Sequence, residues 1–222
     1  MQSENTVTRP TLRRLVIAFL LFIVPVIVFA KIALEVREPQ PVGLDLWMLG
    51  LIHQWASPFI EVLMITITHL GDALLVILLT LGMASLLVYK RRRRAATLLL
   101  FSLGGAAIVN LTLKFLFQRT RPELWPHLVD ENGYSFPSGH AMMSSALALA
   151  IIVLLWPTRW RWLAVILGGV YVGIIGLSRL YLGVHYPTDI VAGWCVSLAW
   201  IVIVAVTLRL VPIPKFLQKA AQ

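Results

Sequence analysis

Charged residues are scarce in this sequence, and their scarcity excludes most soluble protein classes. Only 13% of the 222 residues are charged, whereas 59% are hydrophobic. The apolar residues form unbroken runs instead of the alternating or striped patterns of half-buried strands and helices. A helix that spans the hydrocarbon core of a bilayer needs about 20 apolar residues. The composition therefore predicts an all-α, polytopic membrane protein.

Cysteine is nearly absent, since Cys195 is the only one. An intramolecular disulfide is excluded, and we interpret Cys195 as a packed, inert side chain inside a span. The sequence also lacks internal repeats, low-complexity tracts and any stretch long enough for a soluble domain. We therefore expect residues 1–222 to form a single integral-membrane domain.

Six apolar runs predict a bundle of six transmembrane helices. They cover Leu15–Leu34, Ala73–Tyr89, Ala95–Phe117, Gly139–Trp156, Trp162–Ser178 and Ile190–Val211. The first run has a basic flank like a signal peptide, but no small-residue cleavage pattern follows it, so we expect a retained span. Before the second span, Asp45–Leu70 is predicted to be an interfacial helical segment that Pro58 breaks. The run His69-Leu70-Gly71-Asp72 interrupts the hydrophobicity between the two.

Basic residues lie mostly on one side of the predicted spans. They are Arg9, Arg13, Arg14, Lys90, Arg91, Arg92, Arg93, Arg94, Arg159, Arg161, Arg209, Lys215 and Lys219. Because cytoplasmic loops are enriched in Lys and Arg, we expect a plasma (inner) membrane protein with both termini in the cytoplasm. The net charge of +9 then reflects membrane orientation. No nucleic acid partner is expected, because the basic residues do not alternate with aromatic ones in a stripe.

Four short segments that carry chemistry fall at the opposite, extracytoplasmic ends of the predicted spans. They contain Lys114 with Arg121-Pro122, Pro137-Ser138-Gly139-His140, Ser178-Arg179, and His185 with Asp189. The spans were assigned from hydrophobicity and length alone, so this gathering is an independent result. Ionic groups beside the hydrocarbon core are costly and usually functional. We predict that the segments form one phosphate-handling active site.

The first two segments suit the binding of an anion. Lys114 and Arg121 are two helical turns apart and share a face if their helix continues to Pro122. Ser138 is a good N-cap, and Gly139 lets a ligand approach the N–H groups of a helix start, where the dipole favours negative charge. Taken singly, these residues are equally explained by headgroup contact and helix capping.

The last segment combines a histidine with a carboxylate. Pro187 is predicted to begin the sixth helix, which places His185 just before it and Asp189 in its first turn. Asp189 then bonds one imidazole nitrogen and leaves the other as a nucleophile or base. Together with His140 these residues also resemble zinc ligands, but the neighbouring cations would repel a divalent ion. We expect no metal and no other cofactor.

The four segments resemble the three signature motifs of the type 2 phosphatidic acid phosphatase family, membrane lipid phosphatases related to vanadium haloperoxidases. The resemblance covers residues 114–189 and rests on Lys114-x6-Arg121-Pro122, Pro137-Ser138-Gly139-His140 and Ser178-Arg179-x5-His185-x3-Asp189. It implies that His185 attacks phosphorus to form a phosphohistidine, that Asp189 orients His185, and that His140 protonates the leaving oxygen and then activates water. It also implies a set of groups that hold the nonbridging oxygens: Lys114, Arg121, Ser138, the Gly139 amide and Arg179.

The resemblance implies a membrane lipid phosphate or pyrophosphate as the substrate. Undecaprenyl pyrophosphate, phosphatidylglycerol phosphate, phosphatidate and the phosphates of lipid A are candidates, and the sequence does not choose among them. We expect Glu123–Phe136 and Asp45–Leu70 to select the lipid. Two alternatives stay open, a phosphotransferase that passes the phosphoryl group to another lipid and a non-catalytic lipid binder or translocator. The second would not need both histidines together with Asp189. The sequence does not predict the oligomeric state.

Overall fold

The computed structural model describes residues 12–38 and 43–208, and all regular secondary structure in this part of the chain is α-helical. Its helices are α1 (Leu12–Glu35), α2 (Gly43–His53), α3 (Pro58–His69), α4 (Ala73–Tyr89), α5 (Arg93–Phe117), α6 (Gly139–Leu155), α7 (Arg161–Tyr181) and α8 (Pro187–Thr207). The predicted all-α class is confirmed. The basic residues Arg9, Arg209, Lys215 and Lys219 and the predicted end of the last span lie outside the described residues.

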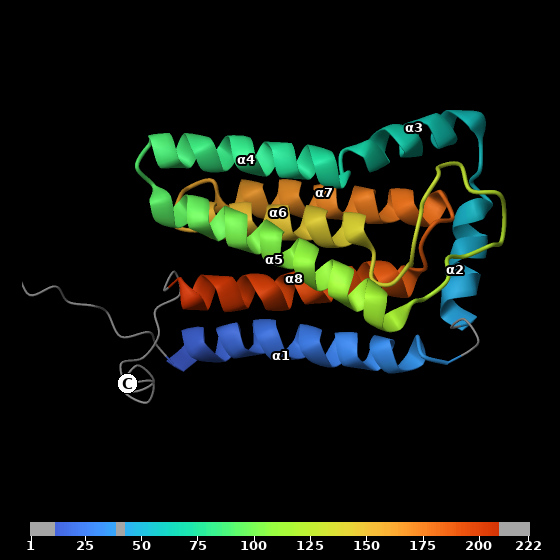
Figure 1. Ribbon diagram of the computed structural model, residues 1–222, viewed down its shortest axis with the longest axis horizontal. Helices are drawn as coiled ribbons and strands as arrows, with labels where there is room; N and C mark the ends of the chain where they lie inside the picture. Colours follow the sequence, from blue (N-terminus) through green and yellow to red (C-terminus); the bar gives the residue numbers. More distant parts are fainter. Residues whose placement is uncertain (1–11, 39–42, 209–222) are drawn as a thin grey trace, which may run out of the picture.

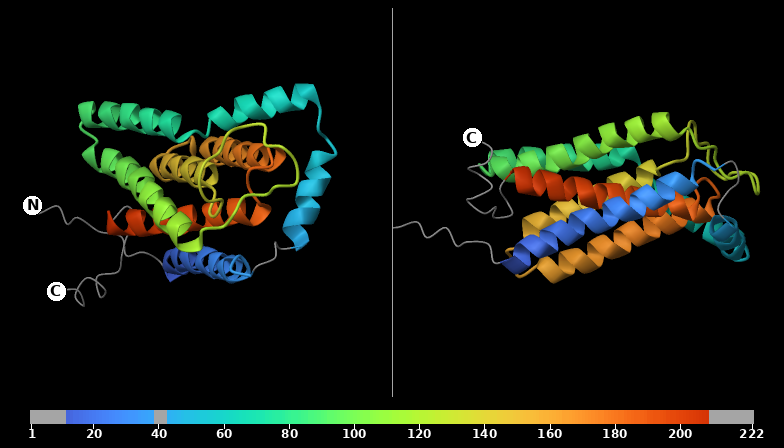
Figure 2. Two further views of the ribbon diagram at one scale, coloured as in Figure 1. Left: turned by 45° about the vertical axis from the view of Figure 1, so that its right-hand side comes forward. Right: turned by 90° about the horizontal axis from the view of Figure 1, so that it is seen from below.

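The long helices run lengthwise beside one another, and α2 lies across one end of them (Figure 1). α6 is the most enclosed helix, because it packs against α5, α7 and α8, and α8 in turn packs against α1 (Figure 2). Small side chains such as Ala141, Ala146 and Ala150 are buried along α6. They allow the surrounding helices to approach closely, as small residues do in membrane bundles.

The number of helices that are long enough to span a membrane is smaller than the six predicted from the sequence. α1, α5, α7 and α8 are long and apolar enough to cross a bilayer, and α3 with α4 makes a fifth span if this pair, bent by 42°, counts as one. α6 is apolar but has only 17 residues, which is at the lower limit for a span. The structure thus supports a polytopic helical membrane protein with four or five spans by length and composition, and the set of six stays a prediction.

The segment before α4 is helical, as predicted, and Pro58 marks a helix start within it. α2 ends at His53, and Pro58 stands in the first turn of α3 behind the N-cap Ser57, whose side chain accepts the N–H of Ile60 at 3.4 Å. Proline suits this position because its missing N–H has no partner there. Leu49 of α2 is fully buried against the adjoining ends of α6, α7 and α8. α2 therefore closes this end of the bundle.

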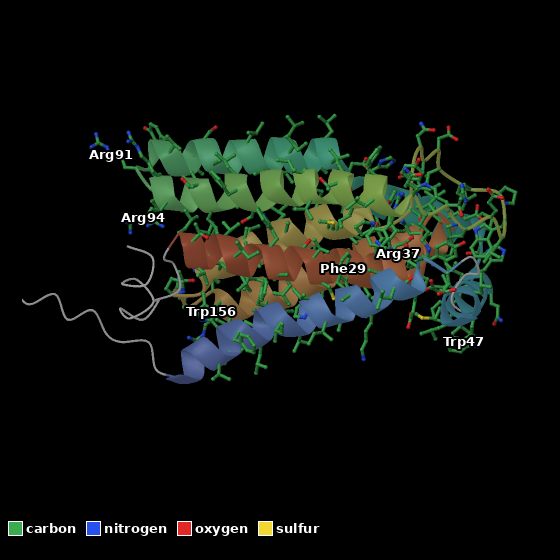
Figure 3. All side chains as sticks on the ribbon, turned by 60° about the horizontal axis from the view of Figure 1, so that its bottom comes forward. Phe29, Arg37, Trp47, Arg91, Arg94 and Trp156 are labelled. Atoms are coloured by element: carbon green, nitrogen blue, oxygen red, sulfur yellow. The ribbon has the colours of Figure 1, made fainter. Side chains whose placement is uncertain are left out.

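The two ends of the bundle differ in the side chains that they carry. Arg91 and Arg94 lie with Trp156 at one end, whereas Trp47 lies on α2 at the other end (Figure 3). The loop of residues 118–138 is also at the α2 end (Figure 1). The α2 end holds all four predicted motif segments, since α5, α6, α7 and α8 each begin or finish there.

Candidate active site

α5 ends before it reaches Arg121. Gln118 adopts the left-handed conformation with a φ of 47°, and its N–H bonds the carbonyl of Lys114 at 3.0 Å. A left-handed residue at this position is a common helix terminator. The prediction that Lys114 and Arg121 share one helical face up to Pro122 is therefore wrong. Arg121 belongs to the loop of residues 118–138.

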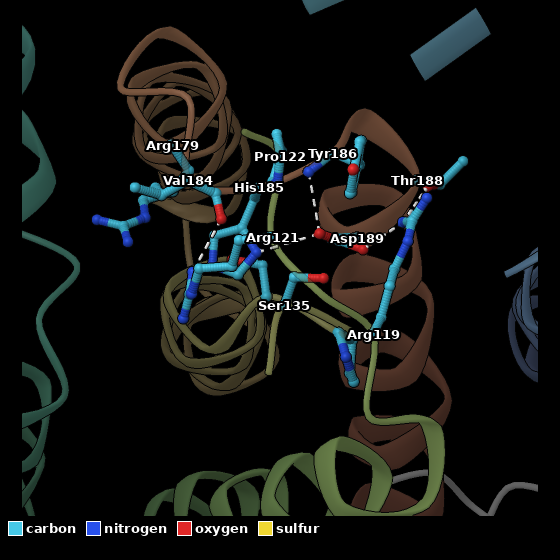
Figure 4. A network of polar contacts seen from close by, with 12 residues as sticks. Arg119, Arg121, Pro122, Ser135, Arg179, Val184, His185, Tyr186, Thr188 and Asp189 are labelled. Carbon is cyan, nitrogen blue, oxygen red and sulfur yellow. Dashed lines mark hydrogen bonds and ion pairs between the residues drawn. The ribbon is translucent and has the colours of Figure 1, made fainter. Parts of the chain in front are cut away.

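α8 begins at Pro187, as predicted, and this start places His185 beside Asp189. Oδ2 of Asp189 lies 3.2 Å from Nδ1 of His185 and accepts the N–H of Tyr186 at 2.9 Å (Figure 4). Asp189 is fully buried and His185 is 1% exposed. The carboxylate favours the tautomer that carries its proton on Nδ1, and the lone pair is then on Nε2.

Arg121 faces this second nitrogen of His185. Its Nη1 lies 3.3 Å from Nε2 of His185 and donates to the carbonyl of Val184 at 2.8 Å (Figure 4). Its Nε donates to the carbonyl of Gly133 at 3.2 Å. Two backbone carbonyls thus hold the guanidinium group next to the lone pair. A phosphorus atom attacked by Nε2 would carry its oxygens within reach of Arg121.

The surroundings of His185 keep its imidazole neutral. Burial lowers the pKa of His185 well below its usual value, and the charges of Arg179, Arg121 and Lys114 lower it further. Both effects disfavour a positive charge on the ring. A neutral ring with one nitrogen bonded to a carboxylate is the form that attacks as a nucleophile.

Arg179 reaches the same region from the end of α7. It is 1% exposed, and its Nη1 donates to Oγ1 of Thr68 at 2.8 Å. Its Nη2 donates to the carboxylate of Glu131, which also accepts from Nη2 of Arg121 at 3.3 Å. Burial alone would raise the pKa of Glu131, but the surrounding positive groups, led by Arg179, lower it overall. The carboxylate of Glu131 thus bridges Arg121 and Arg179, the two arginines that were predicted to bind phosphate.

A second network supports Asp189 from the side of α2. Nη1 of Arg119 donates to Oδ1 of Asp189 at 2.6 Å and to Oγ1 of Thr188 at 2.8 Å, and its Nη2 donates to Oδ2 of Asp45 at 2.9 Å. Asp45 is fully buried and accepts the N–H of Thr188 at 2.9 Å. Arg119 also stacks on the ring of Tyr186, with 3.9 Å between its Cζ and the ring centroid. Asp45 and Arg119 therefore hold the first turn of α8 and the carboxylate that contacts His185.

Ser138 and Gly139 begin α6 as predicted. Ser138 is the N-cap, and its side chain accepts the N–H of Ala141 at 3.5 Å. Its own N–H bonds the carbonyl of Asp189 at 3.2 Å, which ties the start of α6 to the first turn of α8. A Cβ at Gly139 would lie 3.4 Å from Oδ1 of Asn110, so the backbone here packs closely against α5. The two helix starts are thereby joined at the site.

Lys114 and His140 lie near this cluster without a hydrogen bond to another predicted site residue in the described part of the chain. Nζ of Lys114 donates to the carbonyl of Tyr134 in the loop, and its charge still acts on His185. His140 is in the first turn of α6, and its Nε2 lies 2.8 Å from Oδ1 of Asp72.

Four acidic or basic residues of the site have no role in the sequence analysis: Asp45, Asp72, Arg119 and Glu131. Asp72, Arg119 and Glu131 each contact a predicted site residue that is far away in the sequence. Asp45 reaches the site through Arg119 and Thr188. Asp45 and Asp72 did carry a signal, because a carboxylate beside an otherwise apolar run is costly without a partner.

The site can therefore present a neutral nucleophilic histidine, fixed guanidinium groups and a second histidine to one phosphoryl group. Fixed cations stabilise the charge on the equatorial oxygens of a transferring phosphoryl group. This arrangement suits phosphoryl transfer to His185.

Comparison with known proteins gives one family. The model of the PAP2 superfamily matches residues 95–211. Phosphatidylglycerophosphatase B of Bacillus subtilis is 31% identical over 147 residues, which are 64% of this chain and 72% of that protein. Undecaprenyl-diphosphatase of Sulfolobus acidocaldarius is 31% identical over 178 residues, which are 77% of this chain and 81% of that protein.

Solved structures have the same fold. A transmembrane PAP2 type phosphatidylglycerolphosphate phosphatase from Bacillus subtilis matches with a TM-score of 0.78 and 26% identity, over 85% of this chain and 96% of that one. LpxE of Aquifex aeolicus matches with a TM-score of 0.62 over 75% of this chain and 97% of that one. At 22% identity, the second match is a likeness of fold.

Proposed function

Because this chain belongs to the PAP2 superfamily of phosphatases, we propose that it hydrolyses a membrane lipid phosphate or pyrophosphate through a phosphohistidine intermediate. The observation that carries the proposal is the environment of His185. Its Nδ1 is held by the buried Asp189, its ring is neutral, and Arg121 stands 3.3 Å from Nε2.

The reaction has two steps. In the first, Nε2 of His185 forms a bond to phosphorus while the bond to the lipid oxygen breaks and His140 gives that oxygen a proton. In the second, His140 takes a proton from water, the water oxygen attacks phosphorus, and the phosphorus–nitrogen bond breaks. Acid–base help of this kind contributes about 10² to 10⁴ in rate. The nonbridging oxygens bind Arg121, Arg179, Lys114 and the start of α6 at Ser138 and Gly139.

The substrate proposed is a lipid whose phosphate lies at the membrane–water interface. The names of the relatives specify different lipids, namely phosphatidylglycerol phosphate, undecaprenyl diphosphate and lipid A. The loop of residues 118–138 and α2 border the site, and the ring of Trp125 stacks on His53 with 4.0 Å between centroids. We propose that the contact between this loop and α2 selects the lipid.

The proposed function is tested by measuring phosphate release by the purified protein across a panel of lipid monophosphates and diphosphates, with and without an acceptor lipid. Transfer to the acceptor in place of release would identify a phosphotransferase.

The reaction is expected to need no metal ion. Three cationic side chains surround the two histidines, so a divalent ion would be repelled where a phosphate would be attracted. Activity should therefore survive excess EDTA, and vanadate should inhibit it by imitating five-coordinate phosphorus. Phosphate release in both conditions is the measurement. Loss of activity in EDTA that zinc or magnesium restores would contradict this mechanism.

The site is proposed to face the extracytoplasmic side, because the opposite end of the bundle carries the arginines of the α4–α5 turn. In a chain with Cys195→Ala, a cysteine at Glu123 should react with a membrane-impermeant thiol reagent added to whole cells. A cysteine at Arg92 should react only after the cells are opened; both positions are exposed to the surroundings. The reverse labelling pattern would place the site in the cytoplasm.

A further inference from the structure

The connection between α3 and α4, residues 70–72, is fixed to the site although it belongs to none of the recognised motifs. We call it the α3–α4 break; the two helices bend by 42° across it. The hydroxyl of Tyr171 on α7 donates to the carbonyl of Leu70 at 2.8 Å. Just before the break, Thr68 accepts the bond from Arg179. The break is therefore held against α7 on the side where Arg179 enters the site.

Gly71 allows the break to approach His140 closely. A Cβ at Gly71 would lie 2.8 Å from Cγ2 of Ile175 and 3.3 Å from Cδ2 of His140. The first distance is shorter than real Cβ contacts, so any larger residue would push the break away from α6 and α7. The close contact puts the next residue, Asp72, beside the imidazole.

Asp72 binds two histidines with its two carboxylate oxygens. Oδ1 lies 2.8 Å from Nε2 of His140, and Oδ2 lies 2.8 Å from Nδ1 of His69. The side chain of His140 is 16% exposed, that of Asp72 is 41% exposed and that of His69 is 64% exposed. The pair with His140 is thus the more enclosed of the two contacts. Enclosure strengthens a charge-assisted hydrogen bond.

We propose that Asp72 is a positioning residue that orients His140 and stabilises the positive charge on its ring during proton transfer. Nε2–H of His140 donates to Asp72 throughout the reaction, and Nδ1 is the nitrogen that exchanges the proton. In the first step Nδ1–H protonates the departing lipid oxygen as the bond to phosphorus breaks. In the second step Nδ1 takes a proton from the attacking water. Asp72 remains ionised in both steps.

This assignment gives the site two histidine–carboxylate pairs with different tasks. Asp189 holds the ring of the nucleophile His185, and Asp72 holds the ring of the acid–base group His140. A carboxylate bonded to the distal nitrogen of an imidazole fixes its orientation and favours the imidazolium form. The inference rests on the proposed role of His140.

Asp72→Asn tests the inference, because it removes the charge and keeps the shape of the side chain. With a lipid monophosphate, whose alcohol leaves poorly without a proton, kcat should fall about 10-fold to 100-fold. With an activated aryl phosphate, whose leaving group needs little protonation, the fall should be within about threefold. KM should change little for either substrate, and Asp72→Glu should restore part of the lost rate.

Two further variants separate this role from a structural one. Tyr171→Phe removes the hydrogen bond that holds Leu70 of the break against α7 and leaves both histidines unchanged. Any fall in kcat should therefore be equal for the two substrates. In a His140→Ala background, Asp72→Asn should cause no additional loss, since both changes remove the same proton transfer. Equal losses for both substrates with Asp72→Asn, or a full further loss in the His140→Ala background, would overturn the inference. If His140→Ala itself shows no dependence on the leaving group, the proposed function fails instead.

Discussion

Replacing His185 with alanine is expected to abolish formation of the phosphoenzyme with every substrate. The ring of His185 lies between Asp189 and Arg121, so the variant lacks the nucleophile that we propose. The rate of phosphate release should fall by a factor of about 10⁴ or more, as when the nucleophile of another covalent enzyme is removed. Rapid quench with ³²P-labelled lipid phosphate measures the intermediate directly.

His140→Ala is the matched comparison, because it leaves the nucleophile in place. Attack on an activated aryl phosphate should be retained better than attack on a lipid monophosphate. Acid-labile phosphohistidine should accumulate, since the water that hydrolyses it is no longer activated. If the His185→Ala protein traps the phosphoenzyme and the His140→Ala protein forms none, the two roles are reversed.

Replacing Arg119 with methionine is expected to destabilise the protein and to slow it. Methionine keeps much of the side-chain volume but leaves the buried carboxylates of Asp45 and Asp189 without their shared cation. Breaking a buried ion pair by removing one partner costs about 3 to 5 kcal/mol. The midpoint of thermal unfolding in detergent should fall accordingly. The rate of phosphoenzyme formation by the protein that remains folded should also fall, because Asp189 no longer holds His185 as firmly.

Asp45→Asn in combination with Arg119→Met provides the control. The double variant should lose less stability than the sum of the two single losses, since each change removes a charge that the other leaves unpaired. Additive losses would mean that Arg119 and Asp45 do not act as one network.

Local signals in the sequence predicted the parts of the site that lie at helix starts. Pro187 and Ser138 each mark the beginning of a helix through the geometry of the residue itself, proline at the first position and serine as N-cap. The spacing of four residues between His185 and Asp189 then brought the pair together without further information. These features depend on a few consecutive residues, which is why the sequence was sufficient.

The contacts between helices that are distant in the sequence could not be predicted from such local signals. Asp45 is 74 residues from Arg119, and Asp72 is 68 residues from His140. Such pairings depend on where α2 and the α3–α4 break pack, which is set by the whole set of helices. The apolar run ended at Phe117, as α5 does. The continuation to Pro122 that would align Lys114 with Arg121 fails because Gln118 takes a left-handed conformation, which glycine usually provides.

Because Glu131 bridges Arg121 and Arg179, we expect substrate binding to be an exchange of anions. If a phosphate binds between these two residues as proposed, the carboxylate must first leave them, so the affinity measured is the difference between two occupants. The same competition acts on the product, because Glu131 returns to the guanidinium groups as inorganic phosphate departs. A pocket with this many positive charges would otherwise hold the phosphate ion and be inhibited by it. We therefore expect the internal carboxylate to weaken the binding of the product and to limit inhibition by free phosphate.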